Sequence, residues 1–207
     1  MNEKNILVTG FEPFGGEQVN PAWTAVCGLQ DYIGSMRVCK VLLPTEFIRS
    51  TAVLDEALQS CRPSVVRCVG QAGGADRIRL ERVAVNLRDA SAPDNAGAKP
   101  TDEKVIPGGP DGLFATLPLR DIRNALTRGG IPAALSLSAG TYVCNNVMYH
   151  LLYRLRERGG TVPGGFVHVP FLPEQAAAHP GAPSMDARLI TRALGIILET
   201  AALSVAK

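Results

Sequence analysis

The sequence lacks the features that mark several large classes of protein. It contains no apolar run of about 18 residues, the length that a membrane-spanning helix requires. The formal net charge is only +2 and the Lys and Arg residues are scattered, so we expect no nucleic-acid partner and no membrane partner. The first ten residues, MNEKNILVTG, do not resemble a secretory signal because they include Glu3 and only a short apolar run.

The five cysteines include no CxxC pair and no spacing typical of metal ligands. Their number is odd, so a complete set of disulfides is excluded. We therefore expect free thiols in a reducing, cytoplasmic protein. Cys39 and Cys68 lie in apolar runs typical of a core, and the sequence assigns no role to Cys27 or Cys61.

Short apolar runs alternate with amphipathic stretches along the 207 residues, which predicts an α/β fold. We expect a single domain, residues 1–207, with a central, largely parallel twisted sheet and helices on both faces, an α/β/α sandwich. Strands are predicted at residues 5–10, 37–44, 64–70, 77–87, 131–138 and 164–175, the last one broken by Pro170. Helices are predicted at residues 21–29, 46–61, 117–130 and 184–207, and within residues 139–158 with Cys144 in the first turn.

Helix caps and a long polar stretch complete this prediction. Asn20 before Pro21 predicts a helix start, and Thr45 and Ser184 are predicted to cap two later helices. Residues 91–112 are rich in Pro, Gly and Asp and longer than most loops of compact domains. They predict a lid or an excursion over a functional site.

Cys144 is a candidate nucleophile because it follows a predicted strand and falls in the first turn of a predicted helix. Unpaired backbone N–H groups and the positive end of the helix dipole favour the thiolate there, and the thiolate is the reactive form of cysteine. The alternative is a small buried residue, which most free cysteines are.

A cysteine hydrolase also needs a histidine base and a group that orients its ring. His168 lies on an apolar strand and is either a core residue or the base, whereas His150 and His179 are expected on a helix face and in a solvated loop. The acidic candidates are Glu81, Asp94 and Glu174. Glu81 lies in a run that favours burial, but it could instead face solvent beside one of two neighbouring arginines, Arg79 or Arg82.

Several motifs occur in one order from residue 9 to residue 175: TGFEPFGG, GQAGG, ERVAVN, PDNAG, SAGTYVCN and GFVHVPFLPEQ. Together they resemble the pyrrolidone-carboxylate peptidases, also called type I pyroglutamyl peptidases. The resemblance implies a cysteine peptidase that removes an N-terminal pyroglutamyl residue from peptides without a metal or cofactor. It places the nucleophile at Cys144, the base at His168 and the acid at Glu81.

The resemblance also implies a pocket for pyroglutamate, a small neutral lactam, and a homo-oligomer, a tetramer or a dimer. The matching pocket positions are Phe11, Phe14, Asn20, Thr45, Gln71, Ala92, Tyr142 and Val143. Three positions depart from the common family pattern: Ser91 replaces a basic residue, Ala92 a larger aliphatic, and Tyr142 a phenylalanine or leucine.

Two alternatives remain at this point. One is a catalytically weak relative that binds pyroglutamyl ligands, which Ser91 and Ala92 motivate. The other is a phosphate or nucleotide binder that uses the glycines of GFEPFGG or GQAGGAD, although these stretches lack the Lys-Ser/Thr of a P-loop and a regular GxGxxG.

Overall fold

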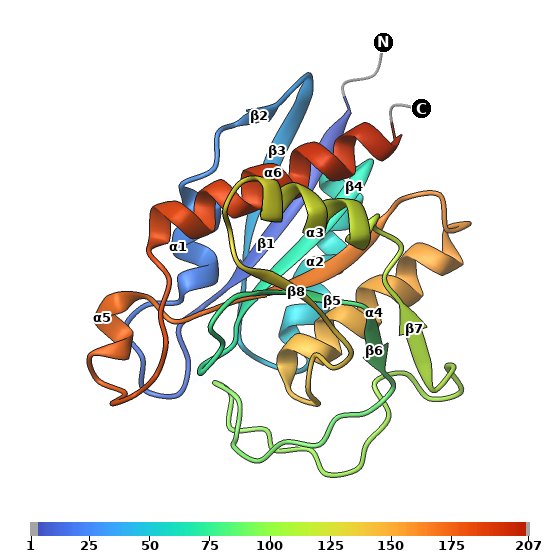
Figure 1. Cartoon of the computed structure of the whole chain (residues 1–207). Coiled ribbons are helices and arrows are strands. Elements are labelled where there is room, and N and C mark those ends of the chain that lie inside the picture. The colour runs from blue at the N-terminus through green and yellow to red at the C-terminus, as the bar shows by residue number, and fades with distance from the viewer. Residues whose placement is uncertain (1–3, 206–207) are drawn as a thin grey trace.

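A seven-stranded mixed sheet forms the centre of the molecule (Figure 1). The structure, a computed structural model, describes residues 4–205. Neighbouring strands are parallel except in the pairs β2–β3 and β9–β5. The strand order is β2 (Tyr32–Ile33), β3 (Met36–Leu43), β1 (Asn5–Phe11), β4 (Val65–Gln71), β9 (Gly164–Val169), β5 (Ile78–Glu81) and β8 (Ala133–Ser136). The predicted α/β fold with a mostly parallel sheet is confirmed.

Helices cover both faces of this sheet (Figure 1). One face packs against α1 (Pro21–Cys27), α3 (Leu119–Arg128) and α6 (Ala187–Val205). The other packs against α2 (Arg49–Cys61) and α4 (Val143–Glu157). The remaining elements are a short helix, α5 (Pro173–Ala176), and a small antiparallel sheet of β6 (Val83–Val85) and β7 (Gly112–Phe114) beside α4.

Burial on both faces explains why the central strands are mostly apolar, with Thr9, Arg67 and His168 as buried exceptions. Nearly every residue of β1, β4 and β9 is buried, as expected for strands between two helical layers. Asn20 caps α1 as predicted, because its side-chain oxygen accepts a hydrogen bond from the Ala22 N–H at 3.0 Å. Pro21 occupies the first helical position.

Two predicted helix caps are wrong. The hydroxyl of Thr45 donates to the Glu12 carbonyl at 2.8 Å, and α2 begins four residues later at Arg49 without a side-chain cap. Ser184 also lies ahead of its helix. Asp186 replaces it, because Oδ1 of Asp186 accepts hydrogen bonds from the Arg188 and Leu189 N–H groups at 2.8 and 3.4 Å. For α6 a polar residue closer to the helix takes the place of the predicted cap, whereas α2 follows Ile48 and has no side-chain cap among the described residues.

The single strand predicted at residues 77–87 is also wrong, because the chain changes partners at Arg82. The preceding segment, β5, joins the main sheet, whereas β6 pairs with β7. Glu81 and Arg82 interrupt the alternation, but a break of one residue in a partly alternating run does not show that the chain changes sheet there. The predicted strand at residues 164–175 ends at Val169, before Pro170, and Pro173 begins α5.

The two ends of the described chain meet at one edge of the molecule. The Lys4 ammonium donates to the Val205 carbonyl at 3.4 Å. Residue 5 begins β1, which runs parallel to β4, so this end lies opposite the carboxyl end of β4. Among residues 4–205 no helix is both long and apolar enough to cross a bilayer.

Candidate active site

Cys144 is the second residue of α4, at the carboxyl edge of the sheet. Tyr142 precedes the helix in an extended conformation, and no side chain caps it. The first backbone hydrogen bond into this turn comes from Asn146, whose N–H donates to Tyr142. Within residues 4–205 the N–H groups of Val143, Cys144 and Asn145 have no acceptor. Three N–H donors are therefore free beside the thiol.

Gly70, near the end of β4, makes room for the Cys144 sulfur because it has no side chain. A Cβ atom added to Gly70 would lie 2.8 Å from the Cys144 Sγ and 2.7 Å from the Phe166 ring. Both distances are shorter than real Cβ contacts allow. Glycine at residue 70 therefore follows from the close approach of the thiol to the strand, not from an unusual backbone angle.

His168 and Glu81 form a buried pair beside Cys144. Glu81 lies opposite Phe166 in the antiparallel β5–β9 ladder, so His168 is its diagonal neighbour on the same face. The His168 Nδ1 and the Glu81 Oε1 are 2.9 Å apart. The Glu81 side chain is wholly inaccessible to solvent, which excludes the solvent-facing alternative beside Arg79 or Arg82.

The electrostatics of His168 differ from those of an isolated core histidine. Burial opposes its protonation, but the charge and hydrogen bond of Cys144, followed by those of Glu81, raise its pKa to about 9. The second Glu81 oxygen is buried with no partner among the described residues. An imidazolium at His168 therefore compensates a carboxylate that is otherwise poorly satisfied.

Two asparagines directly after the nucleophile hold α4 in place. Asn145 exchanges hydrogen bonds of 2.9 Å with the backbone N–H and carbonyl of Val85 and donates to the Leu87 carbonyl. Asn146 donates to the Phe47 carbonyl and accepts from Arg88, both at 2.7 Å. Both side chains are fully buried. Our sequence reasoning did not identify them, although two helix-disfavouring asparagines in a buried first turn are a usable signal.

Aromatic rings gather next to the Cys144 turn. The Tyr142 ring centroid lies 6.1 Å from that of Phe14 and 5.3 Å from that of Phe47, the second contact being edge-on. Phe11 is buried against Phe166, which in turn contacts the His168 ring at 4.8 Å. Two phenylalanines of FEPF thus occupy different environments: the Phe14 ring is half-buried, whereas the Phe11 ring belongs to the core.

The other predicted pocket residues differ in how close they come to this cluster. Asn20 and Thr45 both donate to the Glu12 carbonyl, and Val143 is buried beside the thiol. The Gln71 side chain turns instead toward α5, where its oxygen accepts from Gln175 at 3.1 Å. Ala92 is exposed.

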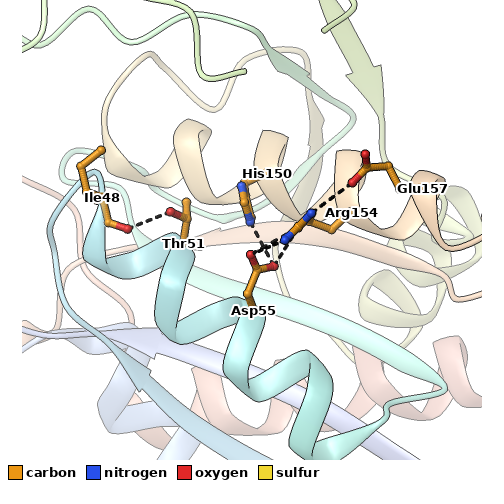
Figure 2. A network of polar contacts seen from close by, with 6 residues as sticks. All are labelled: Ile48, Thr51, Asp55, His150, Arg154 and Glu157. Carbon is orange, nitrogen blue, oxygen red and sulfur yellow. Dashed lines mark hydrogen bonds and ion pairs between the residues drawn. The ribbon is translucent and has the colours of Figure 1, made fainter. Parts of the chain in front are cut away.

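The remaining polar candidates lie outside this group. His150 points from α4 to Asp55 of α2 at 3.1 Å, in a network that includes Arg154 (Figure 2). Burial lowers the His150 pKa against the opposing charge of Asp55. His179 is exposed and contacts Glu17. Within residues 4–205 no cluster of three or more His, Cys, Asp or Glu side chains is arranged to hold a metal ion.

Comparisons with known proteins agree on one family. The model of a family described as pyroglutamyl peptidase matches residues 4–204. A pyrrolidone-carboxylate peptidase of Escherichia fergusonii is 53% identical over 199 residues, which are 96% of this chain and 92% of that protein. One from Yersinia pestis is 45% identical over 199 residues, 96% and 93% of the two chains.

Solved structures extend the similarity to the whole fold. A crystal structure of Bacillus amyloliquefaciens pyroglutamyl peptidase I matches with a TM-score of 0.93 and 44% identity, covering 97% of this chain and 98% of that one. A mutant pyrrolidone carboxyl peptidase from Pyrococcus furiosus matches with a TM-score of 0.94 and 40% identity, covering 97% and 99%. The chain therefore belongs to the pyroglutamyl peptidase family, cysteine peptidases that remove an N-terminal pyroglutamyl residue from peptides.

Proposed function

We propose that Cys144, His168 and Glu81 are the catalytic triad of this pyroglutamyl peptidase. The observation that carries the proposal is the 2.9 Å contact between His168 and Glu81, with Cys144 as the other polar partner of the imidazole. Glu81 engages Nδ1, which leaves Nε2 for the thiol. The raised pKa of His168 favours a thiolate–imidazolium pair, which supplies the nucleophile and the acid together.

In the acylation step the Cys144 sulfur attacks the carbonyl carbon of the pyroglutamyl residue. The C–N bond breaks, a proton passes from His168 to the departing amine, and a thioester forms. A water molecule then attacks the thioester while His168 accepts its proton, which releases pyroglutamic acid and restores the thiolate. Glu81 holds the imidazole and stabilises its charged form throughout.

The free N–H groups at the start of α4 support an oxyanion site in the same proposal. Cys144 and its two neighbours offer three uncommitted donors next to the sulfur, and no side chain caps the helix to compete for them. Such donors stabilise the oxyanion of a tetrahedral intermediate, and losing one typically costs about 10²–10³ in rate. The missing cap therefore leaves this turn available for catalysis.

The pocket belongs to the proposal as well. Pyroglutamate carries one N–H and one carbonyl on an apolar ring, so its site needs apolar walls and a few directed polar groups. Phe14 and Tyr142 supply aromatic surface beside the nucleophile. The full set of proposed substrate-binding residues is Phe11, Phe14, Asn20, Thr45, Gln71, Ala92, Tyr142 and Val143.

A fluorogenic pyroglutamyl-coumarin amide tests the triad. Wild type should hydrolyse it, and Cys144→Ala should abolish hydrolysis. Cys27→Ala is a matched control because Cys27 is exposed at the end of α1, and it should leave the rate unchanged. Iodoacetamide should inactivate the enzyme in proportion to carbamidomethylation of Cys144, read by peptide mass spectrometry, whereas alkylation of the exposed Cys27 should not change the rate. Activity that survives in Cys144→Ala would contradict the triad.

The assembly and setting of the chain are further parts of the proposal. Exposed apolar side chains such as Phe114 and Leu137 support a homo-oligomer, which sedimentation velocity would detect. Five free thiols support a reducing, cytoplasmic location for a single-domain enzyme spanning residues 1–207.

A further inference from the structure

The segment Pro93–Asn95, part of the PDNAG motif, contacts three walls of the proposed pocket. The Tyr142 hydroxyl donates to the Pro93 carbonyl at 2.9 Å. The Asn95 amide donates to the Pro13 carbonyl, next to Phe14, also at 2.9 Å. The Asn95 backbone N–H donates to the Thr45 carbonyl at 3.0 Å. One short segment thus joins residues that are far apart in the sequence.

Asp94 makes this segment stiff. Its side chain is buried, and one carboxylate oxygen accepts from the Phe47 N–H at 2.8 Å. The other accepts from the N–H groups of Ala96 and Ala98 at 3.0 and 2.8 Å. A turn closed on its own carboxylate holds its neighbours at fixed positions. Asp94, an acidic candidate from the sequence, therefore acts on the backbone and not on His168.

These hydrogen bonds and the aromatic contacts join the same residues into a closed ring of contacts next to the Cys144 turn. Phe47, whose N–H is held by Asp94, packs edge-on against Tyr142, and Tyr142 contacts Phe14, whose neighbour Pro13 is held by Asn95. We propose that Asn95 and the Tyr142 hydroxyl are positioning residues that fix the width of the pocket and so set the size of lactam ring that it accepts. This inference rests on the proposed function of the pocket.

Tyr149, within α4, provides an internal comparison with Tyr142, which immediately precedes the helix. Tyr149 lies seven residues, or two helical turns, after Tyr142, and its hydroxyl donates to the Pro110 carbonyl at 2.6 Å. Both tyrosines therefore fasten the same long stretch, residues 91–112, to α4. Only the Pro93 end adjoins Phe14 and Thr45. The two hydroxyls are chemically alike but differ in their distance from the pocket along the chain.

The closed ring of contacts would control which size of lactam ring the pocket accepts. A five-membered and a six-membered lactam differ by one methylene group and present the same N–H and carbonyl. A rigid pocket discriminates against one extra methylene by about 10–200-fold in kcat/KM. Loosening one wall lets the larger ring fit and lowers this ratio, whereas a loss of folded enzyme lowers both kcat/KM values equally and leaves the ratio unchanged.

The experiment compares two coumarin amides, one with pyroglutamate and one with its six-membered homologue. The ratio of the two kcat/KM values should fall about three- to tenfold in Tyr142→Phe and in Asn95→Ala, the range expected from losing one hydrogen bond. Tyr149→Phe is the matched control for the hydroxyl. Asn124→Ala, which removes an exposed amide on α3, is the control for Asn95. Both controls should keep the wild-type ratio.

Calorimetric binding separates this inference from the proposed chemistry. Pyroglutamyl and homologous lactam peptides are titrated into Cys144→Ala, alone and combined with Tyr142→Phe or Asn95→Ala. A smaller preference for the five-membered ring in the combined variants supports the positioning role even if wild type proves inactive, a result that would overturn only the triad. An unchanged preference in both assays, or an equal change in Tyr149→Phe, would overturn the positioning role while leaving the triad intact.

Discussion

Arg67 is a charged residue in the centre of the sheet, and its removal should stabilise the protein. The side chain is wholly inaccessible on β4, and its Nε and Nη2 atoms have no partner among the described residues. Its one hydrogen bond, from Nη1 to the Phe166 carbonyl, is 3.4 Å long. Burial lowers the Arg67 pKa to about 10, and the negative charge of Cys68, where ionised, opposes this shift only weakly.

The size of the effect follows from this pKa. A decrease from 12.5 to about 10 means that the buried charge lowers the free energy of unfolding by about 3 kcal/mol, at about 1.4 kcal/mol per pKa unit. The charged form is the disfavoured one, so the penalty is present throughout the range below pH 10. It declines as the pH rises from about 10 toward 12.5, where the folded protein loses the proton first.

Arg67→Met keeps the length of the side chain and removes the charge. We expect the free energy of unfolding at pH 7 to rise by about 1–3 kcal/mol, because apolar replacements of poorly compensated buried charges commonly stabilise. Reversible urea unfolding followed by Trp23 fluorescence would measure the change. Arg79→Met, which replaces the exposed arginine of β5, should change stability by less than about 0.5 kcal/mol. A loss of more than 1 kcal/mol in Arg67→Met would refute the reasoning and indicate a well-satisfied guanidinium.

Three further predictions concern the site and one helix. Because the His168 pKa is raised from 6.5 to about 9, its imidazolium stabilises the fold fully below about pH 6.5, and this contribution is lost as the pH rises through 9. The pH profile of kcat/KM should fall over the same upper range. Glu81→Gln should move that fall to lower pH and reduce the rate at least about tenfold. A pH profile that does not move in Glu81→Gln would contradict the pairing of His168 with Glu81. Gly70→Ala should lower kcat/KM by about 10²-fold by displacing the Cys144 sulfur, and alkylation kinetics of the thiol would show whether it has moved. Gly195→Ala, in an open position within α6, should instead raise unfolding stability by about 1 kcal/mol and leave the rate unchanged, as thermal unfolding and the coumarin assay would show together.

The sequence predicts the layers of this fold well because hydrophobic periodicity reports burial. It predicts less about which strands become neighbours. Glu81 and His168 were each selected as polar residues on apolar strands, but nothing local shows that β5 turns antiparallel against β9 and brings them to 2.9 Å. The same gap explains the strand divided at Arg82, since periodicity does not report which strand becomes the partner.

Polar residues with more than one possible partner were the other source of error. Thr45 is a good helix cap by type, yet its hydroxyl donates to the Glu12 carbonyl, 33 residues away in the sequence. Gln71 stays a predicted pocket residue, and its side-chain oxygen also has a protein partner, because it accepts a hydrogen bond from Gln175. Asn145 and Asn146 were overlooked because their partners, at Val85, Phe47 and Arg88, come from distant segments. Such contacts depend on the tertiary fold.

The contact between Lys4 and Val205 has a practical consequence for handling the enzyme. Both ends of the described chain lie at the edge of the sheet opposite the carboxyl end of β4, where Cys144 is held. A solid support or fusion partner attached through either end would leave the thiol facing outward. The same proximity suits circular permutation: a short linker could join the ends, and new termini could open in an exposed turn such as Gly159–Gly160 without crossing the active site.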